Sequence, residues 1–350
     1  MTYTFSSCSS LETINLYNFK TQKIGNMVGL FNKCSSLKSV DLSSFNFNNT
    51  IDLSYVFQGC SSLTSIDLSN FNKINITDMS NLFDGCPSIR SIDLSKLVTK
   101  EVQNMRNMFR NCKSLLSLDL SSFNTKNVED MKGMFEECNL LTSLIISSFQ
   151  TDNVESMEKM FKGCKSLTSI NIGNFINEIL DNTCEMFEEC ESLKFLDLSD
   201  FQTNSVTNMN SMFKGCKSLT SIDLSNFNTE NVENMNNMFE DCSNLTNINL
   251  YSFKTELLSE MDYMFRGCLS LTSIDLSNFY TEYLDKINGI FVNCPFLQYM
   301  DISSFVWEDD ETIYLSDFLA NTGVLIINKD FYSKLRNKPN NWEIKFLNNN

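Results

Sequence analysis

Aspartates and cysteines that recur at fixed positions are the residues of this chain that could do chemistry. Four consecutive copies of a repeating stretch carry an aspartate at the same place: Asp41, Asp67, Asp93 and Asp119. Neighbouring strands lie roughly 4.8 Å apart, so we expect these like charges to raise one another's pKa and to titrate as a group. Such a row suggests hard-cation sites, or carboxylates that serine hydroxyls, water and partial protonation satisfy. No single repeat supplies the roughly six to eight oxygens that Ca²⁺ takes.

Twelve of the 13 cysteines form a second column, which runs from Cys8 to Cys294. Each follows a phenylalanine by three residues and precedes a leucine or isoleucine by three. A free cysteine packs as a small apolar group, so we interpret the column as a reduced, buried ladder. Disulfides between neighbouring strands are an alternative at this spacing. One thiolate per repeat cannot place four ligands around zinc, so we expect no zinc site. We expect no cofactor and, apart from the possible cation row at the aspartates, no bound metal.

No set of residues in the sequence forms a catalytic constellation. The chain has no histidine, which removes the commonest general base and the commonest transition-metal ligand. There is no glycine-rich phosphate loop, and the aspartates repeat along the chain without converging as a pair. We therefore expect that the protein is not an enzyme.

Aromatic residues at positions that most copies fill with serine or threonine are the candidates for binding. They are Tyr17, Phe195, Tyr251 and Tyr299, to which we add the polar neighbours Asp197, Asn247 and Asn249. Tyrosine is favoured at protein interfaces because it buries a large area at low entropic cost. Phe195 with Asp197 forms one predicted hot spot, and Tyr251 with the two asparagines forms the other.

The elements that position these side chains repeat every 26 residues. Alternating apolar and polar residues from Leu63 to Phe71 predict a strand with one buried face. Spacings of three and four from Val128 to Cys138 predict a short helix, with Thr125 or Asn127 as its N-cap. The methionines fall mainly in two columns of the same stretch, and we expect them to fill the core together with the phenylalanines and cysteines.

The unbroken period predicts coils that stack and bury their faces on one another. We expect residues 1–305 to form one solenoid of about twelve coils, and residues 306–350 to form a C-terminal cap. This last segment loses the pattern and contains two strand-like runs, Val324 to Asn328 and Trp342 to Phe346. The first coil has no polar cap, which suggests that a partner or a second copy covers it.

A charged column follows the core phenylalanines. Its signs alternate over seven copies: Arg110, Glu136, Lys162, Glu188, Lys214, Glu240 and Arg266. We expect neighbouring coils to pair these opposite charges. Exposed ion pairs contribute only about 0 to 1 kcal/mol each, so the column would set the register of the coils more than their stability.

The repeat resembles a known family. The stretch LTSIDLSNF, from Leu219 to Phe227, is similar to the leucine-rich-repeat strand LxxLxLxxN, with phenylalanine in place of the asparagine. The longer unit from Phe213 to Phe239 resembles the 26-residue repeat of the BspA-like leucine-rich-repeat surface proteins, and the resemblance covers residues 5–305. It implies an α/β repeat solenoid: a right-handed arc with a parallel strand ladder on one face and short helices on the other. It also implies adhesion or protein binding at a cell surface.

Charge and hydropathy restrict the partners and the location. With 27 basic and 43 acidic residues the net charge is -16, so nucleic acid and bare anionic membrane are poor partners. No signal peptide, lipid anchor or apolar run of about 18 residues is visible. We expect a cell-surface or secreted protein on the family resemblance, and a cytoplasmic one otherwise.

Two functions stay open on the sequence. The first is a non-catalytic protein-interaction or adhesion module that presents a concave strand face to a protein or glycan partner. The second is a structural assembly element that self-associates through its N-terminal coil.

Overall fold

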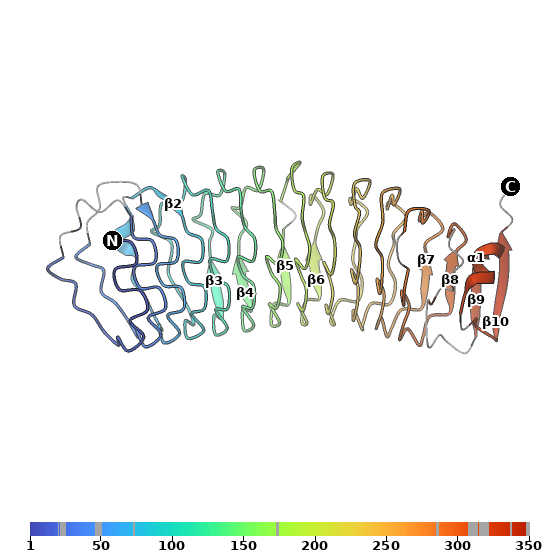
Figure 1. The fold of residues 1–350 in the computed structure, drawn as a ribbon, viewed down its shortest axis with the longest axis horizontal. Helices are drawn as coiled ribbons and strands as arrows, with labels where there is room; N and C mark the ends of the chain where they lie inside the picture. Colours follow the sequence, from blue (N-terminus) through green and yellow to red (C-terminus); the bar gives the residue numbers. More distant parts are fainter. Residues whose placement is uncertain are drawn as a thin grey trace. The chain divides into compact units, whose positions relative to one another are not determined.

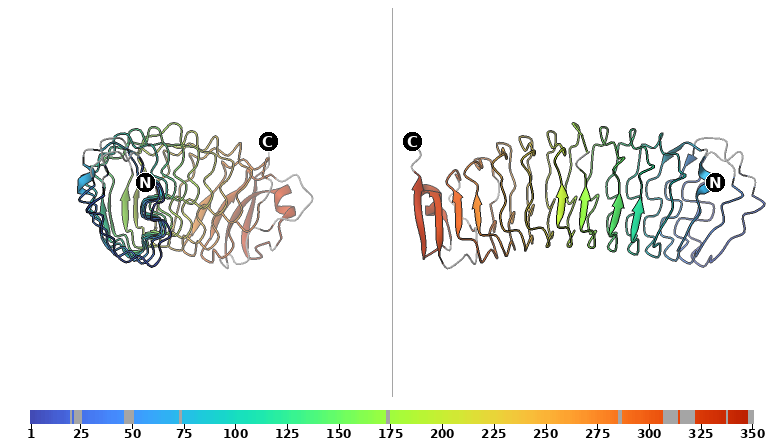
Figure 2. Two further views of the ribbon diagram at one scale, coloured as in Figure 1. Left: turned by 60° about the vertical axis from the view of Figure 1, so that its left-hand side comes forward. Right: turned by 180° about the vertical axis from the view of Figure 1, so that it is seen from behind.

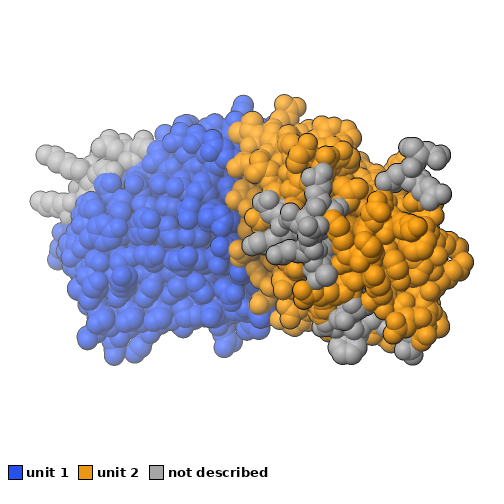
Figure 3. Space-filling model, turned by 45° about the vertical axis from the view of Figure 1, so that its right-hand side comes forward, with its two compact units in different colours: residues 1–177 blue, residues 178–350 orange. Residues whose placement is uncertain are grey.

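The structure is a computed structural model in two compact units, residues 1–177 and 178–350 (Figure 3). It describes residues 1–19, 21, 26–45, 51–72, 74–172, 175–284, 287–306, 314, 322–336 and 338–347. The predicted division into a solenoid (1–305) and a cap (306–350) stays a prediction, and much of 306–321 lies outside the described residues.

Short parallel strands in unit 1 pair across one repeat. Strand β3 (Ser117–Asp119) lies beside β4 (Ser143–Ile145), with Ser117 opposite Ser143 (Figure 1). Strand β5 (Ser169–Asn171) occupies the same part of its coil. On another side of the coils, β1 (Ile51–Asp52) pairs in parallel with β2 (Ile76–Asp78). Parallel pairing at an offset of one repeat is the geometry of stacked coils.

Unit 2 contains the same kind of strand and a short terminal segment. Strands β6 (Phe195–Asp197) and β7 (Ser273–Asp275) are followed by β8 (Tyr299–Ile302), β9 (Gly323–Asn328), helix α1 (Lys329–Lys334) and β10 (Trp342–Leu347). The last four strands form one sheet in the order β7-β8-β9-β10 (Figure 2). The Asn328 side chain caps α1 by accepting from two backbone amides. Both strand-like runs predicted near the C-terminus are therefore strands.

No strand is assigned between Leu63 and Phe71, so the predicted strand is wrong in this coil, although its faces are largely as expected, with Ile66 half-buried. Leu63, Leu68 and Phe71 are buried, while Ser65, Asp67 and Ser69 are exposed. The last three residues, Ser69–Phe71, form the 3₁₀ turn η1, in which the Phe71 amide donates to the Leu68 carbonyl. In the coils where strands are assigned, β3 to β7 contain three residues each.

The predicted helix from Val128 to Cys138 is wrong, because this stretch consists of overlapping turns. The amides of Met134 and Cys138 donate to carbonyls three residues earlier, at 3.2 and 3.1 Å. Between them, the Phe135 amide donates to the Met160 carbonyl of the following coil at 2.9 Å. Alternate amides thus bond within the coil and to the next coil. Turns closed over three residues give nearly the same apolar spacing as a helix, which explains the error.

Two residues per coil have a left-handed backbone, which no helix of L-residues sustains. In this coil they are Gly133 and Glu137, with φ of 59° and 60°. A Cβ on Gly133 would lie 2.4 Å from Oδ1 of Asn107 in the preceding coil, so the glycine also allows close stacking. Within the described residues α1 is the only α-helix, so the fold is a parallel β-solenoid and not the expected α/β solenoid with a helical face.

The core is built from columns, as the period predicts. Phe135 is fully buried, and its ring stacks on those of Phe109 and Phe161 at centroid distances of 5.8 and 5.6 Å. Met131 and Met134 are also fully buried. In unit 2, Phe213, Phe239 and Phe265 repeat this stack at 5.6 and 5.5 Å. Near-parallel offset rings at such distances are a favourable aromatic arrangement.

The two predicted N-caps have other partners, because the helix they would cap is absent. Thr125 is fully buried, and its hydroxyl donates to the Gln150 carbonyl at 2.8 Å and accepts from the Gln150 amide at 2.7 Å. The Asn127 side chain donates to the Lys100 carbonyl of the preceding coil at 2.8 Å. The same buried threonine clamp recurs at Thr99, Thr203, Thr229, Thr255 and Thr281. These side chains join coils where no strand pairs them.

In unit 1, the residues that directly follow the core phenylalanines also join the coils before the charged column, through side-chain hydrogen bonds. Ser6 donates to Asn32 at 3.4 Å, Asn32 donates to Gln58 at 2.6 Å, and Gln58 donates to Asp84 at 2.9 Å. The Arg110 guanidinium donates two hydrogen bonds, of 2.9 and 2.8 Å, to the buried Asp84 carboxylate. In unit 2, Glu240 lies between Lys214 and Arg266, at 2.7 and 3.3 Å. Pairing of opposite charges between these coils is thus confirmed.

Candidate binding surface

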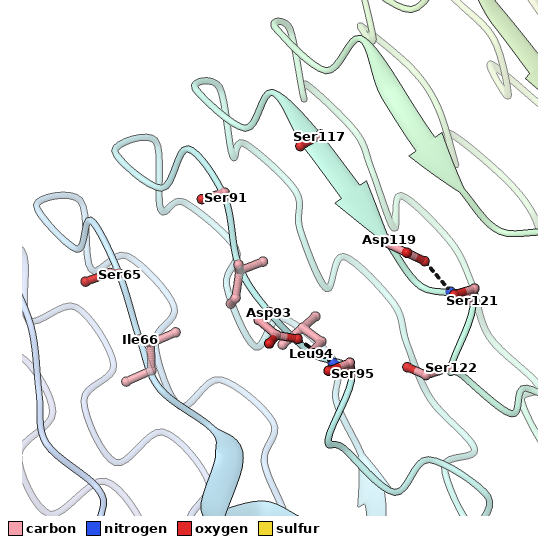
Figure 4. A pocket seen from close by; sticks show the side chains of 11 residues that line it. Ser65, Ile66, Ser91, Asp93, Leu94, Ser95, Ser117, Asp119, Ser121 and Ser122 are labelled. Atoms are coloured by element: carbon pink, nitrogen blue, oxygen red, sulfur yellow. Dashed lines mark hydrogen bonds between the residues drawn. The ribbon is translucent and has the colours of Figure 1, made fainter.

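The outward face of the strands is a regular serine and aspartate surface. Asp93 accepts the Ser95 backbone amide on Oδ1 at 2.9 Å, and Asp119 does the same for Ser121 at 2.9 Å (Figure 4). Each such contact closes a small turn at the end of the strand. The aspartate column is therefore explained first by local backbone structure.

The predicted rise in the pKa of the aspartates is wrong. The pKa of Asp41, Asp67, Asp93 and Asp119 is lowered from its ordinary value. In each case the backbone amide and hydroxyl of the serine two residues later stabilise the charged form. Repulsion from Asp41 and Asp93 raises the pKa of Asp67 by less than these hydrogen bonds lower it. The carboxylates are exposed, so water screens the row and partial protonation is not needed.

A hollow of about 520 Å³ lies on this face of unit 1 (Figure 4). Its walls carry serines and aliphatic side chains, with Asp93 and Asp119 as its titratable groups. Among the described residues, no three aspartate, glutamate or cysteine side chains come together as a metal-ligand set. The structure therefore lends no support to a row of cation sites.

The aromatic candidates are exposed, as the sequence predicts. Tyr251 and Tyr17 are 86 % and 77 % exposed, Phe195 is 64 % exposed, and Tyr299 is 37 % exposed. Phe195 is the first residue of β6 and Tyr299 is the first residue of β8. Tyr17 lies in unit 1 and the other three lie in unit 2. The Tyr251 amide donates to Oδ1 of Asn249 at 3.0 Å, so this backbone is held by the same turn as in the aspartate copies.

The polar candidates accompany these aromatics on single stretches of chain. Asp197 is the last residue of β6 and accepts the Ser199 amide at 3.1 Å. Asn247 is exposed and donates to the Thr246 hydroxyl at 3.1 Å. The first predicted hot spot therefore lies within one strand, and the second within one five-residue segment.

The cysteine column makes a contact that sequence reasoning missed. The Cys138 thiol donates to the Phe109 carbonyl at 3.2 Å, a carbonyl that also accepts the Cys112 amide. Equivalent thiol contacts are made by Cys60, Cys86, Cys112, Cys164, Cys216, Cys242, Cys268 and Cys294. All 13 cysteines are thiols outside disulfide bonds. A small side chain with one donor fits this position, which accounts for the choice of cysteine.

The buried thiols are held in their protonated form. Burial raises the pKa of Cys60, Cys138, Cys242 and Cys294 to about 12. Because the folded-state pKa lies above the value of about 8.5 for a free cysteine, this contribution to stability is complete below pH 8.5 and is lost as the pH rises towards 12.

Alkylation should distinguish the cysteines by burial. Iodoacetamide at about pH 8 should modify the exposed Cys8 rapidly and the half-buried Cys184 more slowly, and should leave Cys138 unmodified until the protein unfolds. Peptide mass spectrometry after timed quenching measures this order. Modification of Cys138 at the rate of Cys8 would contradict the buried ladder.

No helix in the described part of the chain is long and apolar enough to cross a membrane.

Stacked parallel strands joined by turns define the protein as a β-solenoid whose strand face carries several exposed aromatic residues. Residues 1–118, 77–195, 103–221 and 181–305 match the family described as "Mycoplasma protein of unknown function, DUF285". The chain belongs to this family.

Solved structures similar to this chain include leucine-rich-repeat proteins. One from Bacteroides ovatus is 16% identical, with 96% of this chain and 91% of that chain covered and a TM-score of 0.41. A leucine-rich cell surface protein from Faecalibacterium prausnitzii is 17% identical, with 96% and 87% covered and a TM-score of 0.46. At these scores the likeness carries no conclusion about function. No curated protein sequence matches the chain.

Proposed function

We propose that this protein is a non-catalytic binding module that presents the strand face of unit 2 to a protein partner. The observation that carries the proposal is the exposure of Phe195 and Tyr251, 64 % and 86 %, at positions where most other coils carry serine. Large aromatic side chains on a rigid scaffold bury much area at little entropic cost, and they dominate the binding energy of interfaces. Asp197, Asn247 and Asn249 would supply the polar rim, with Tyr299 as a further contact, while Tyr17 is a separate candidate in unit 1.

The backbone beneath these side chains is fixed, which reduces the entropy lost on binding. Asn249 holds the Tyr251 amide at 3.0 Å. Leu196 and Leu198, which flank Asp197, point into the core with 9 % and 4 % exposure. A surface substitution should therefore change binding without changing the fold.

Affinity capture tests this proposal. The double variant Phe195→Ser, Tyr251→Ser should lose a protein captured by the unaltered chain, with affinity weakened by about 30-fold or more if both are hot spots. The control replaces two exposed leucines of unit 1, Leu116→Ser and Leu140→Ser, and should retain capture. Equal capture by both variants would refute the proposal, and capture that glycosidase treatment of the partner abolishes would assign the face to a glycan.

A second candidate function is self-association through the N-terminal coil. In this coil Phe5 and Leu11 are only half-buried and Cys8 is exposed, whereas Phe31, Leu37 and Cys34 one repeat later are fully buried. Sedimentation velocity over a range of protein concentrations separates the two, because only the assembly element gains mass with concentration. The resemblance to BspA-like surface proteins favours the binding module, and also a cell-surface location.

A further inference from the structure

A second exposed patch in unit 2 lies outside the strand face. It consists of Glu256, Leu257, Tyr280, Glu282 and Tyr283, which we call the tyrosine patch. Its three large side chains are 52 % (Leu257), 48 % (Tyr280) and 63 % (Tyr283) exposed. Leu257 and Tyr283 occupy equivalent positions of two consecutive coils, 26 residues apart, and Tyr280 lies three residues before Tyr283.

In an earlier coil, the positions of these side chains carry asparagines that make hydrogen bonds within the fold. Residues 228–231 read Asn-Thr-Glu-Asn, residues 254–257 Lys-Thr-Glu-Leu and residues 280–283 Tyr-Thr-Glu-Tyr. Asn228 accepts the Glu230 amide at 3.0 Å, and Asn231 donates to the Asn204 carbonyl of the preceding coil at 2.7 Å. Asn127 and Asn153 make the same cross-coil bond at 2.8 Å. Leucine at 257 cannot make it, so stability does not explain the exchange.

The scaffold holds the patch rigidly. The Tyr280 amide donates to the Thr255 hydroxyl at 2.6 Å, and the Tyr280 carbonyl accepts from that hydroxyl at 3.2 Å. Leu258 and Leu284, each directly after a patch residue, are buried. The rings are thus displayed from a fixed backbone.

Carboxylates lie among the rings. Tyr280 donates a hydrogen bond to Glu282, and its pKa is raised first by this bond and by the charge of Glu282, with smaller effects of Tyr283 and Glu256. The nearby ammonium of Lys254 contacts Glu230 one coil earlier. Aromatic faces beside carboxylates attract guanidinium and ammonium groups through cation–π and charge interactions.

We propose that the tyrosine patch docks an arginine- or lysine-rich segment of a partner protein. The charge of the patch and the net charge of -16 on the whole chain are complementary to such a segment. The aromatic and aliphatic side chains supply contact area for the long stems of arginine and lysine. The tyrosine patch shares no residue with the proposed strand-face site, so either proposal can fail without the other.

Fluorescence anisotropy with a labelled nonapeptide of alternating arginine and serine tests the inference on the full chain. Tyr280→Ser with Tyr283→Ser should weaken binding by about tenfold, since each ring contributes about 0.5 to 1 kcal/mol. Glu256→Gln with Glu282→Gln should weaken it by a similar factor, while Tyr280→Phe with Tyr283→Phe should retain most of it. The control Asp152→Asn with Glu155→Gln removes two exposed charges from unit 1, away from any tyrosine, and should change binding less than twofold.

The variant Leu257→Asn gives a second, independent readout. It restores the side chain that bonds across coils at Asn231, so the melting temperature should stay unchanged or rise while peptide binding falls. If the Asp152→Asn, Glu155→Gln control weakens peptide binding equally, the peptide binds through general charge attraction and the inference is overturned. Unchanged binding by the tyrosine-to-serine variant would also overturn it, as would displacement of the peptide by an equal concentration of spermine.

Discussion

Replacing Phe135 by alanine is expected to destabilise unit 1 by about 3 to 5 kcal/mol. The side chain is fully buried between the rings of Phe109 and Phe161, so its removal leaves a cavity and breaks two stacking contacts. The coils on both sides are themselves held by cross-coil hydrogen bonds and cannot collapse freely into the space. Urea unfolding followed by circular dichroism measures the loss.

Two further variants show that the effect comes from the ring stack. Phe135→Leu keeps much of the volume and should cost less than the alanine variant. Phe296 is 61 % exposed, and Phe296→Ala should change the unfolding free energy by no more than about 0.5 kcal/mol. A cost below about 1 kcal/mol for Phe135→Ala would show that the phenylalanine column is not the core.

Replacing Thr125 by valine is expected to cost about 2 to 4 kcal/mol, although the two side chains have nearly the same shape. The Thr125 hydroxyl both donates to and accepts from the Gln150 backbone, at 2.8 and 2.7 Å. Valine would leave the Gln150 amide and carbonyl without this partner in a part-buried position, and a fully buried group left unpaired costs about 1 to 3 kcal/mol. The loss is again measured by urea unfolding.

Thr142 supplies the matched control for this substitution. Its hydroxyl also donates to a carbonyl of the preceding coil, that of Leu116 at 3.0 Å, but the residue is exposed. Water can replace the hydrogen bond there, so Thr142→Val should cost about 0.5 kcal/mol or less. Equal costs at the two positions would mean that the buried threonine clamp has no special role.

The period alone predicted which residues form the core and which strand residues face outward. Leu68 is buried between the exposed Asp67 and Ser69, as an alternating strand requires. The paired charges at Glu240 were also predictable, since like charges would otherwise face each other along the stack. These features follow from one-dimensional repetition, which places equivalent residues of successive coils side by side.

The wrong predictions share a physical cause. In each, a local turn or a cross-coil contact forms hydrogen bonds with backbone groups for which the sequence suggests another role. The apolar spacing around Phe135 suits a helix and a run of turns equally, and only the left-handed residues decide between them. The Asp67 carboxylate binds the amide of Ser69, so its pKa falls where repulsion alone would raise it. Thr125 fits the N-cap of a helix, but threonine recurs at this position in most coils, and that recurrence is a visible signal of a contact between coils.

The candidate binding residues were predicted from exposure expected on the strand face, and that exposure is found. The tyrosine patch was not predicted, because Leu257 and Tyr283 lie in a stretch that was assigned to the start of a helix. Its signal in the sequence is that the position of Asn231 carries leucine in the next coil and tyrosine in the coil after that.

The central claim is that alternate backbone amides of the turn stretch bond to the following coil. Coupling across hydrogen bonds, measured by nuclear magnetic resonance on protein with ¹⁵N-glutamate and ¹³C-carbonyl-lysine, tests it directly. We expect correlations from Glu137 to Lys162 and from Glu189 to Lys214, one pair in each unit, whose donors and acceptors lie 2.7 Å apart. Absence of both correlations in the folded protein would contradict the solenoid of turns.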